Sequence, residues 1–592
     1  MTNSMIPARK EFADMSLKDA MRTLAATASP SRRRLFALTV ALMLVGAFAE
    51  LATIGAVLPF LALVTAPERA QDYPQLIALG ERFGGGQAGI VLAGAALLIT
   101  VAIVAGVVRL ALTWVNLRFI LLYGHDVGVT IFGRLLRQPY NDFVTRNSSV
   151  ALSSIDKLNS VVFGVLMPLM QGAAAAVISV FIVVGLLIID PVAASMAAFS
   201  LGFTYIAVSL LTRARLGRNA STLGAASTER VKVVQEGLGG LRDILIDDSQ
   251  VVYEQAFAQL DYRYRSALVV NNMIALAPRF LVETAVIVMI AVITVYFAQS
   301  PGGLIAAVPV LGALAIGAQR LLPLVHLAYN GWAAFAGSSQ LIIDIAQLLR
   351  IPVLKSAGGP KRALPLPFAN EILINDVCFQ YQEGEPALRG VSLAIKKGER
   401  IGFVGKTGSG KSTLIDLLMG LLPAKHGEIR IDGTKLDEDT VANWQAQIAH
   451  VPQSIYLSDG TIASNIAFGV AREEIDMDRV VEAARGADID SFIARQPGAY
   501  DATVGERGVR LSGGQRQRIG IARALYKGAD VLVFDEATSA LDENTESAIM
   551  ESIYRLDRNV TLLMIAHRVS TLSGCDRIIR LAEGRIVEIE KA

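Results

Sequence analysis

The first 350 residues alternate between long apolar runs and shorter polar segments rich in arginine. A membrane-spanning helix needs about 20 mostly apolar residues. Runs of at least that length lie near 36–64, 88–117, 161–189, 192–212, 278–298 and 303–323. Several are longer than a bilayer requires, so the pattern predicts six spanning helices, some of which continue beyond the membrane.

The distribution of arginine and lysine predicts how these spans are oriented. Arg32, Arg33 and Arg34 precede the first span, and the segments between spans two and three and between spans four and five are also basic. The opposite loops carry only Arg69 and Arg82. Since basic loops stay in the cytoplasm, we expect both termini there. The two long basic segments predict helical extensions, and the stretch 239–248 is expected either to touch a soluble domain or to be a solvated connector.

The first outside loop has apolar residues at helical spacing. The positions are Tyr73, Leu76, Ile77, Gly80 and Phe83. Spacings of three and four residues predict an amphipathic helix. This helix is expected to contact either membrane lipid or the neighbouring spans.

Ionisable side chains occur within or at the edges of the spans. They are Glu50, Arg109, Arg279, Glu283 and Arg320. A charge inside the bilayer is costly unless it faces a cavity or a partner. Arg279 and Glu283 are four residues apart and are expected to pair. Arg109 and Arg320 either line a cavity for an anion or pair across helices.

The pattern changes after residue 350. Residues 351–368 contain four prolines and a Gly-Gly pair, which marks a linker. Short apolar strands then alternate with helical patterns, as in an α/β domain. We therefore expect a transmembrane domain over 1–350, a linker over 351–368 and a soluble domain over 369–592.

A glycine-rich segment in the soluble half matches the phosphate-binding pattern G-x-x-x-x-G-K-[ST]. It follows the apolar strand 401–404 and opens a helical run. Backbone N–H groups of such a loop surround phosphates, and the helix N-terminus adds its positive end. We expect Lys411 to reach the β- and γ-phosphates and Ser412 to hold Mg²⁺. The predicted nucleotide-binding residues are Gly405, Thr407, Gly408, Ser409, Gly410, Lys411, Ser412 and Thr413.

A second apolar strand, 531–534, ends in the carboxylates Asp535 and Glu536. Asp535 is placed to bind Mg²⁺, directly or through water. Glu536 is then the natural base to polarise the attacking water. Together with the glycine-rich loop, this strand predicts ATP hydrolysis.

Bulk composition excludes some function classes. The 592 residues are 53% hydrophobic and 18% charged, which is too apolar for a soluble enzyme. The net charge of +2 gives no indication of nucleic-acid binding. Cys378 and Cys575 have no framework of further cysteines, so a reducing compartment is expected.

The segment Leu511-Ser512-Gly513-Gly514-Gln515 is the signature sequence of the ABC ATPases, and the chain resembles ABC exporters over nearly its whole length. The resemblance implies a six-span α-helical transmembrane domain followed by an α/β P-loop ATPase domain. It also implies roles for Tyr381 on adenine, Gln453 at Mg²⁺, the exporter-specific loop 503–508, Asp542 in the loop that crosses the dimer interface and His567 at the γ-phosphate.

In that family the signature of one subunit completes the ATP site on the phosphate loop of the other. The resemblance therefore implies a homodimer in which Ser512, Gly513, Gly514 and Gln515 contact the partner's ATP. It further implies alternating access, driven by ATP and Mg²⁺, in the inner (cytoplasmic) membrane of a bacterium.

Smaller motifs resemble bacterial flippases for lipid-linked oligosaccharides used in protein N-glycosylation. They are Glu50 with Ile54, Pro59 and Phe60, and the segments 146–149, 319–323 and 456–461. This resemblance implies a polyprenyl-diphosphate glycan as cargo, with Arg109, Arg279 and Arg320 at the pyrophosphate and Tyr73, Leu76 and Ile77 at the lipid tail. The alternatives are an exporter of other lipids, peptides or drugs, and an ATP-gated channel or regulator.

Overall fold

The computed structural model describes residues 15–65, 78, 82–83, 86–145, 148–189, 191–298, 303–354, 365–381, 385–536, 543–554, 557–566 and 572–591. The chain forms two compact units. Unit 1 comprises Met1–Leu136 and Arg146–Ile351. Unit 2 comprises Pro352–Ala592 together with the short segment Arg137–Thr145. The second unit therefore includes a short segment that, in the sequence, interrupts the first unit.

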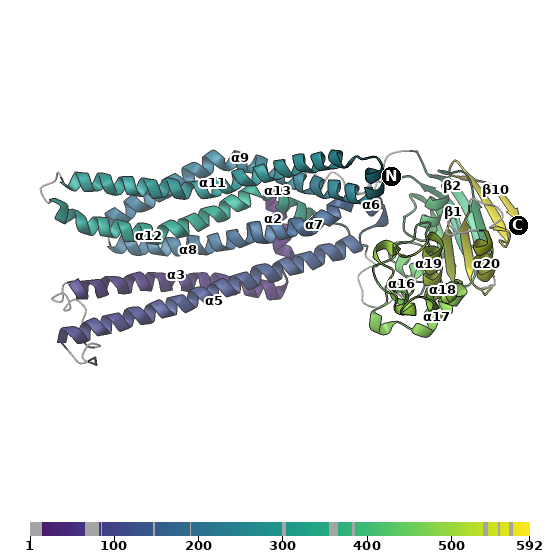
Figure 1. Cartoon of the computed structure of the whole chain (residues 1–592), viewed down its shortest axis with the longest axis horizontal. Coiled ribbons are helices and arrows are strands. Elements are labelled where there is room, and N and C mark those ends of the chain that lie inside the picture. Colours follow the sequence, from purple (N-terminus) through teal and green to yellow (C-terminus); the bar gives the residue numbers. More distant parts are fainter. Residues whose placement is uncertain are drawn as a thin grey trace. The chain divides into compact units, whose positions relative to one another are not determined.

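All secondary structure in the described residues of unit 1 is helical (Figure 1). The predicted spans lie on α3 (Pro30–Thr65), α5 (Gly86–Leu136), α8 (Met167–Ile189), α9 (Pro191–Gly239), α11 (Gln250–Ala298) and α12 (Gly303–Gly337). Shorter helices are α2 (Leu17–Thr27), α7 (Ser148–Val161), the π-helical turn η2 (Val162–Leu166), α10 (Leu241–Ile246) and α13 (Ser339–Leu348). Within the unit, α3 lies beside α5, α8 beside α12 and α9 beside α11.

The long helices extend beyond the thickness of a bilayer. Helix α5 has 51 residues, which at about 1.5 Å per residue gives roughly 75 Å, against a hydrocarbon core of about 30 Å. Within the described part of the chain, three helical stretches are long and apolar enough to cross a membrane, Pro30–Val57, Gly86–Leu136 and Ser149–Ile188. The other three predicted spans lie on α9, α11 and α12, each of which has side chains outside the described set.

Two glycines allow α8 and α12 to approach closely. A Cβ on Gly331 would lie 2.6 Å from the Pro168 carbonyl oxygen, and a Cβ on Gly172 would lie 2.8 Å from the Leu327 carbonyl oxygen. Small residues at such crossings let helix backbones touch inside a membrane, where van der Waals packing is the main attraction between helices.

Replacement of Gly331 by Ala should therefore separate α8 from α12 and destabilise unit 1 by about 1–3 kcal/mol. Gly217→Ala on α9 is the matched control, because its Cβ would meet nothing within 4 Å and alanine favours a helix by about 1 kcal/mol over glycine. The measurement is the temperature at which detergent-purified protein loses its monodisperse elution peak. Equal shifts for the two variants would contradict this packing argument.

Unit 2 contains two sheets. The six-stranded sheet has the order β10-β9-β3-β8-β7-β6, and the four-stranded sheet has the order β2-β1-β4-β5. The strands are β1 (Glu371–Phe379), β2 (Leu388–Lys396), β3 (Arg400–Val404), β4 (His426–Ile431), β5 (Thr434–Lys435), β6 (Ile448–Val451), β7 (Val531–Asp535), β8 (Thr561–Ile565), β9 (Arg577–Ala582) and β10 (Arg585–Lys591). The pairs β3–β8, β3–β9, β6–β7 and β7–β8 are parallel.

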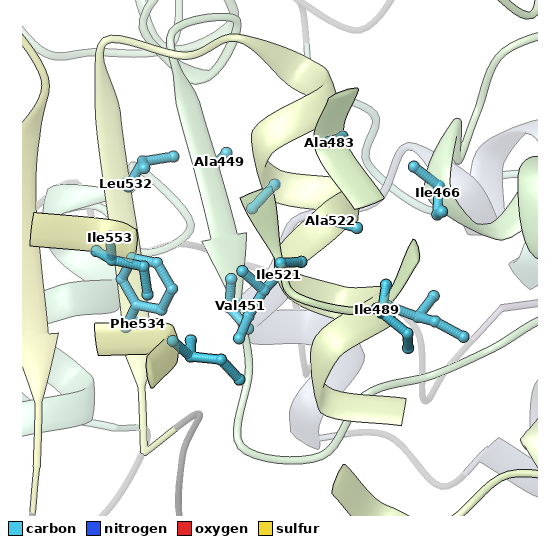
Figure 2. Packing of buried hydrophobic residues seen from close by; sticks show 14 of the residues in the cluster. Ala449, Val451, Ile466, Ala483, Ile489, Ile521, Ala522, Leu532, Phe534 and Ile553 are labelled. Carbon is cyan, nitrogen blue, oxygen red and sulfur yellow. The ribbon is translucent and has the colours of Figure 1, made fainter. Parts of the chain in front are cut away.

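The described residues of unit 2 also form eight α-helices. They are α6 (Tyr140–Thr145), α14 (Lys411–Leu418), α15 (Val441–Gln445), α16 (Ile462–Ile466), α17 (Met477–Gly486), α18 (Asp490–Ala494), α19 (Gly513–Lys527) and α20 (Glu543–Tyr554), with short 3₁₀ turns η4 (Arg472–Glu474), η5 (Ala499–Asp501) and η6 (Glu506–Gly508). Figure 2 shows Phe534 of β7 near Val451 of β6 and Ile521 of α19, and Leu532 of β7 on the side of Ala449 of β6. This apolar core fixes the ends of β3 and β7, where the predicted chemistry lies.

Candidate functional site

The glycine-rich loop connects β3 to α14 and depends on three glycines with positive φ. Gly405, Gly408 and Gly410 have φ values of 156°, 82° and 102°. A Cβ on Gly405 would lie 2.4 Å from the Leu581 carbonyl oxygen, and one on Gly410 would lie 2.7 Å from the Ala387 carbonyl oxygen. Both the backbone conformation and the close approach therefore require glycine.

Lys411 is the first residue of α14 and lies back against the loop. Its ammonium group donates to the carbonyl oxygens of Gly405 at 2.7 Å and Lys406 at 3.1 Å. Behind the loop, the Gly584 N–H donates to the Ser409 carbonyl at 3.1 Å. The Ser409 hydroxyl is buried and has no hydrogen-bond partner among the described atoms. The hydrogen bond from Gly584 therefore fixes the loop backbone. The Lys411 ammonium group and the Ser409 hydroxyl can then bind a phosphate.

The two carboxylates lie at the end of β7, as the sequence predicts. Glu536 has a φ of 49°, and its N–H donates to the Ile565 carbonyl at 3.0 Å. Its carboxylate accepts a 2.6 Å hydrogen bond from the Gln453 side-chain amide. A non-glycine residue at positive φ marks backbone strain, which clusters at functional sites. The structure therefore brings the predicted base and the predicted glutamine together.

Burial makes this corner of the unit unfavourable for negative charge. The pKa of Asp535 is raised by burial and then by Glu536, while Lys411 opposes the shift. Burial and the neighbouring Asp535 raise the pKa of Asp416, on α14, to about 6. Clustered carboxylates in a half-buried site are stabilised by a cation. Sequence reasoning missed Asp416, whose helical position gave no sign that it approaches β7.

Tyr381 lies over the start of α14. Its ring is 37% exposed and packs edge-on against Phe379 at 5.0 Å between centroids. Its hydroxyl is 3.4 Å from the Thr413 hydroxyl. A half-exposed aromatic ring beside the phosphate loop is well placed to stack on a base.

Helix α6 was another feature that the sequence analysis missed. It follows α5 in the chain but belongs to unit 2. The Leu354 N–H donates to the Arg137 carbonyl at 3.1 Å. Burial raises the pKa of Tyr140, and Asp416 and Tyr381 raise it further. The sequence signal that could have indicated a separate short helix is Pro139, since proline often ends one helix and begins another.

The signature segment forms the start of α19. The Ser512 side chain accepts from the Gln515 N–H at 3.3 Å, and the Ser512 N–H donates to the Gln515 side-chain oxygen at 2.8 Å. This reciprocal capping box positions the first turn, in which Gly513 and Gly514 carry no side chain that would cover the N–H groups. The described hydrogen bonds of Ser512 and Gln515 stay within this turn, and none of them reaches the glycine-rich loop.

In unit 1, the structure pairs every candidate arginine. Arg109 Nη1 lies 3.1 Å from Glu50 Oε1, and Arg320 Nη1 lies 3.4 Å from Glu50 Oε2. Arg279 Nε donates to Glu283 Oε1 at 2.8 Å. Pairing across helices was one of two interpretations of Arg109 and Arg320, and this geometry matches it.

Several predicted positions lie outside the described residues. They are Asp542, His567, Tyr73, Leu76 and Ile77, together with Gly80 of the external helix, residues 355–364 of the linker, and Arg146 and Asn147.

The residues present fit a magnesium nucleotide. Glycines at positive φ free the loop N–H groups for phosphate oxygens. The Ser412 hydroxyl, the Gln453 amide oxygen and the Asp535 carboxylate are the oxygen ligands that Mg²⁺ prefers. Glu536 lies beside Gln453 and next to Asp535, where it can polarise a water molecule.

A sequence model described as ABC transporter matches residues 388–539. The protein named ATP-dependent lipid A-core flippase in Cupriavidus metallidurans is 31% identical over 532 residues, which is 86% of each chain. Proteins of the same name in Saccharophagus degradans and Alkalilimnicola ehrlichii are 43% identical over 244 residues and 34% identical over 403 residues. These two alignments cover 41% and 66% of the relative's own length.

A solved structure gives a match over both units. The structure of a bacterial Atm1-family ABC exporter with ATP bound superposes with a TM-score of 0.73 at 25% identity. The match covers 94% of this chain and 95% of that chain.

Proposed function

Because this chain belongs to the ABC transporter family and has the fold of an Atm1-family exporter, we propose that it is an ATP-driven flippase for a phosphorylated glycolipid. The cargo moves from the cytoplasmic to the outer leaflet by alternating access. Two cargoes would fit this description. One is lipid A-core, which appears in the names of the relatives. The other is a polyprenyl-diphosphate glycan, which the smaller sequence motifs favour. Both carry phosphate groups next to sugars on a lipid.

The observation that carries this proposal is the charge cluster of Glu50, Arg109 and Arg320. Two guanidinium groups share one carboxylate, so the cluster has an excess positive charge within the predicted spans. Intramembrane charges of this kind are, by default, a hypothesis for a functional site. Guanidinium groups match phosphate in a two-point geometry.

The ATPase unit supplies the driving force in this account. Lys411 and the loop amides hold the phosphates, and Tyr381 stacks on the base. Mg²⁺, held by Ser412, Gln453 and Asp535, would neutralise charge that develops on the phosphates. Glu536 polarises the attacking water, with Gln453 fixing the position of its carboxylate.

The working unit in this proposal is a homodimer in the bacterial inner membrane, with both termini in the cytoplasm. The exposed helix start at Ser512 has N–H groups suited to a phosphate, and its described hydrogen bonds do not reach the loop of its own chain. We infer that a second copy completes each ATP site. Identical chains favour a closed twofold pair.

The substitutions Arg109→Gln and Arg320→Gln are expected to lower lipid translocation by about tenfold each, the effect of losing one charge-assisted contact. Basal ATP hydrolysis should persist, because both residues lie in unit 1. Arg279→Gln should have a smaller effect, since Arg279 has its own carboxylate. Arg265→Gln is the matched control, because Arg265 pairs with Asp261 on the same helix and is 71% exposed.

The measurement is translocation in proteoliposomes, with lipid A-core in one arm and a polyprenyl-diphosphate glycan in the other. Translocation of one and not the other identifies the source. Failure of the wild-type protein to move either, with ATP hydrolysis intact, would refute the flippase. Stimulation of hydrolysis by uncharged drugs or peptides would favour a different exporter, and an ATP-dependent ion current would favour a channel.

A further inference from the structure

The chain passes between its two units at three places, after Leu136, after Thr145 and after Ile351. The helices of unit 1 that adjoin these crossings are α5, α7 and α13. The Arg134 guanidinium of α5 donates to the Ile351 carbonyl at 3.0 Å. The Lys157 ammonium group of α7 forms an ion pair with the Asp344 carboxylate of α13. The segments beside all three crossings are therefore joined to one another within unit 1.

The ion pair between α7 and α13 is largely enclosed. The Lys157 side chain is 7% exposed and that of Asp344 is 19% exposed. The Asp344 carboxylate also accepts from the Gln340 side-chain amide at 2.9 Å, which holds it in place on its own helix. Loss of one partner of a buried ion pair leaves an uncompensated charge in the interior, which is strongly unfavourable. The pair therefore resists separation of α7 from α13.

The buried side chains of α13 are apolar. They are Leu341, Ile342, Ile345, Ala346 and Leu348. Helix α13 packs against α2, α7 and α9. Because burial of apolar surface is non-directional, it fixes the register between α13 and α7 less strictly than an ion pair does. The Lys157–Asp344 pair is thus the contact that specifies how these two helices meet.

Both partners lie on segments that lead into spans. Helix α7 continues through η2 into α8, and α13 follows α12 after a break at Ser338. Helices α8 and α12 approach each other closely at Gly172 and Gly331. The turn η2 is π-helical, an irregularity that is frequent at functional sites. With the pair intact, a displacement that reaches α7 or α13 is therefore expected to move α8 and α12 together.

We propose that Lys157 and Asp344 are positioning residues that couple ATP hydrolysis to transport, because their ion pair makes α7 and α13 move as one body. This inference rests on the proposed function, since it assumes that the spans respond to ATP. Without the pair, α7 and α13 shift separately, and the displacement of unit 2 no longer moves α8 and α12 together. Hydrolysis then continues with little transport.

The experiment removes the pair without leaving a buried charge. Lys157→Met with Asp344→Leu replaces the pair with apolar side chains, an exchange that often keeps or raises the stability of a protein. Lys157→Asp with Asp344→Lys instead exchanges the two charges and keeps an ion pair at the same place. The apolar variant should lose coupling, and the charge-exchanged variant should regain it.

Replacement of a second ion pair, Arg32→Met with Asp126→Leu, is the matched control. The Arg32–Asp126 pair is also largely enclosed, with side chains 20% and 24% exposed. It joins α5 to α3, and α3 adjoins none of the three crossings. Coupling should therefore survive in this variant.

The first readout needs no cargo. It is hydrogen–deuterium exchange of the full-length protein in nanodiscs, with and without ATP and Mg²⁺, in a Glu536→Gln background. ATP should slow exchange in the glycine-rich loop of every variant, which shows that the nucleotide binds. With the pair intact, ATP should also change exchange in α8 and α12, and the apolar variant should lose this second response. A pair that only stabilised the fold would leave the response of the spans unchanged.

The second readout is the number of lipid molecules translocated per ATP hydrolysed in proteoliposomes, with Glu536 in place. This ratio should fall about tenfold in the apolar variant, within the usual range for coupling between distant sites. Basal hydrolysis should persist, because the ATP-binding residues are untouched. The charge-exchanged variant and the Arg32–Asp126 control should both keep a ratio near that of the wild type.

An apolar variant whose α8 and α12 still respond fully to ATP would overturn the proposal. An equal loss in the Arg32–Asp126 control would overturn it as well. If the wild-type protein moves no lipid, but the apolar variant alone loses the response to ATP, the flippase is refuted and the role of the pair is supported. If the wild-type protein moves lipid and the apolar variant keeps the same ratio, the role of the pair alone is refuted.

Discussion

Replacement of Glu536 by Gln is expected to lower steady-state ATP hydrolysis by about 10²- to 10⁴-fold, the usual contribution of a positioned base. Glutamine keeps the shape of the side chain and the strained backbone at a φ of 49°. It cannot accept the proton of the attacking water. ATP binding should persist, because the glycine-rich loop and Lys411 are untouched.

Hydrolysis by detergent-purified protein, measured beside equilibrium ATP binding, tests this expectation. Glu588→Gln on β10 is the control, because Glu588 is exposed and pairs with Arg580. That variant should hydrolyse ATP at the wild-type rate. Turnover by Glu536→Gln within about tenfold of the wild type would mean that another residue acts as the base.

The ATPase fold and its loop could be predicted because their determinants are local. The glycines, Lys411 and Ser412 are neighbours in sequence, and the preceding apolar strand confirms their context. The exporter fold was likewise predicted and is confirmed by the match over both units. Apolar run lengths placed the long helices for the same reason, since hydrophobic thickness acts on each segment separately.

Contacts between distant segments could not be predicted in this way. Glu50, Arg109 and Arg320 are separated by 59 and 211 residues in the chain, and only the packing of α3, α5 and α12 decides that they meet. Asp416 approaches Asp535 for a similar reason, because α14 packs on the sheet that contains β7. The spacing of apolar residues predicts which face of a helix is buried. It does not predict which side chain of another helix packs against that face.

The second large effect concerns the pairing of two chains. Lys411→Ala should abolish ATP retention at the loop that carries it, since the Lys411 ammonium group lies against the loop carbonyls and the residue is 6% exposed. Ser512→Arg should abolish retention at the opposite loop, because it places a bulky side chain where the capped start of α19 would meet the partner's nucleotide. In the proposed homodimer, each substitution is therefore expected to act on a different ATP site.

This difference predicts how the two substitutions combine. When they lie on different chains, both fall on the same site and the other site stays intact. When they lie on one chain beside a wild-type partner, each damages a different site and no intact site remains. Both dimers contain the same two substitutions, so any loss of stability from the altered helix cap is common to them.

The most direct test of the shared site is the amount of ATP retained by these two mixed dimers, purified through two affinity tags in a Glu536→Gln background. Dimers with Lys411→Ala and Ser512→Arg on different chains should retain about one ATP per dimer, and dimers with both on one chain should retain none. The reverse pattern, with retention only when both substitutions lie on one chain, would show that each chain binds ATP alone and would contradict the account.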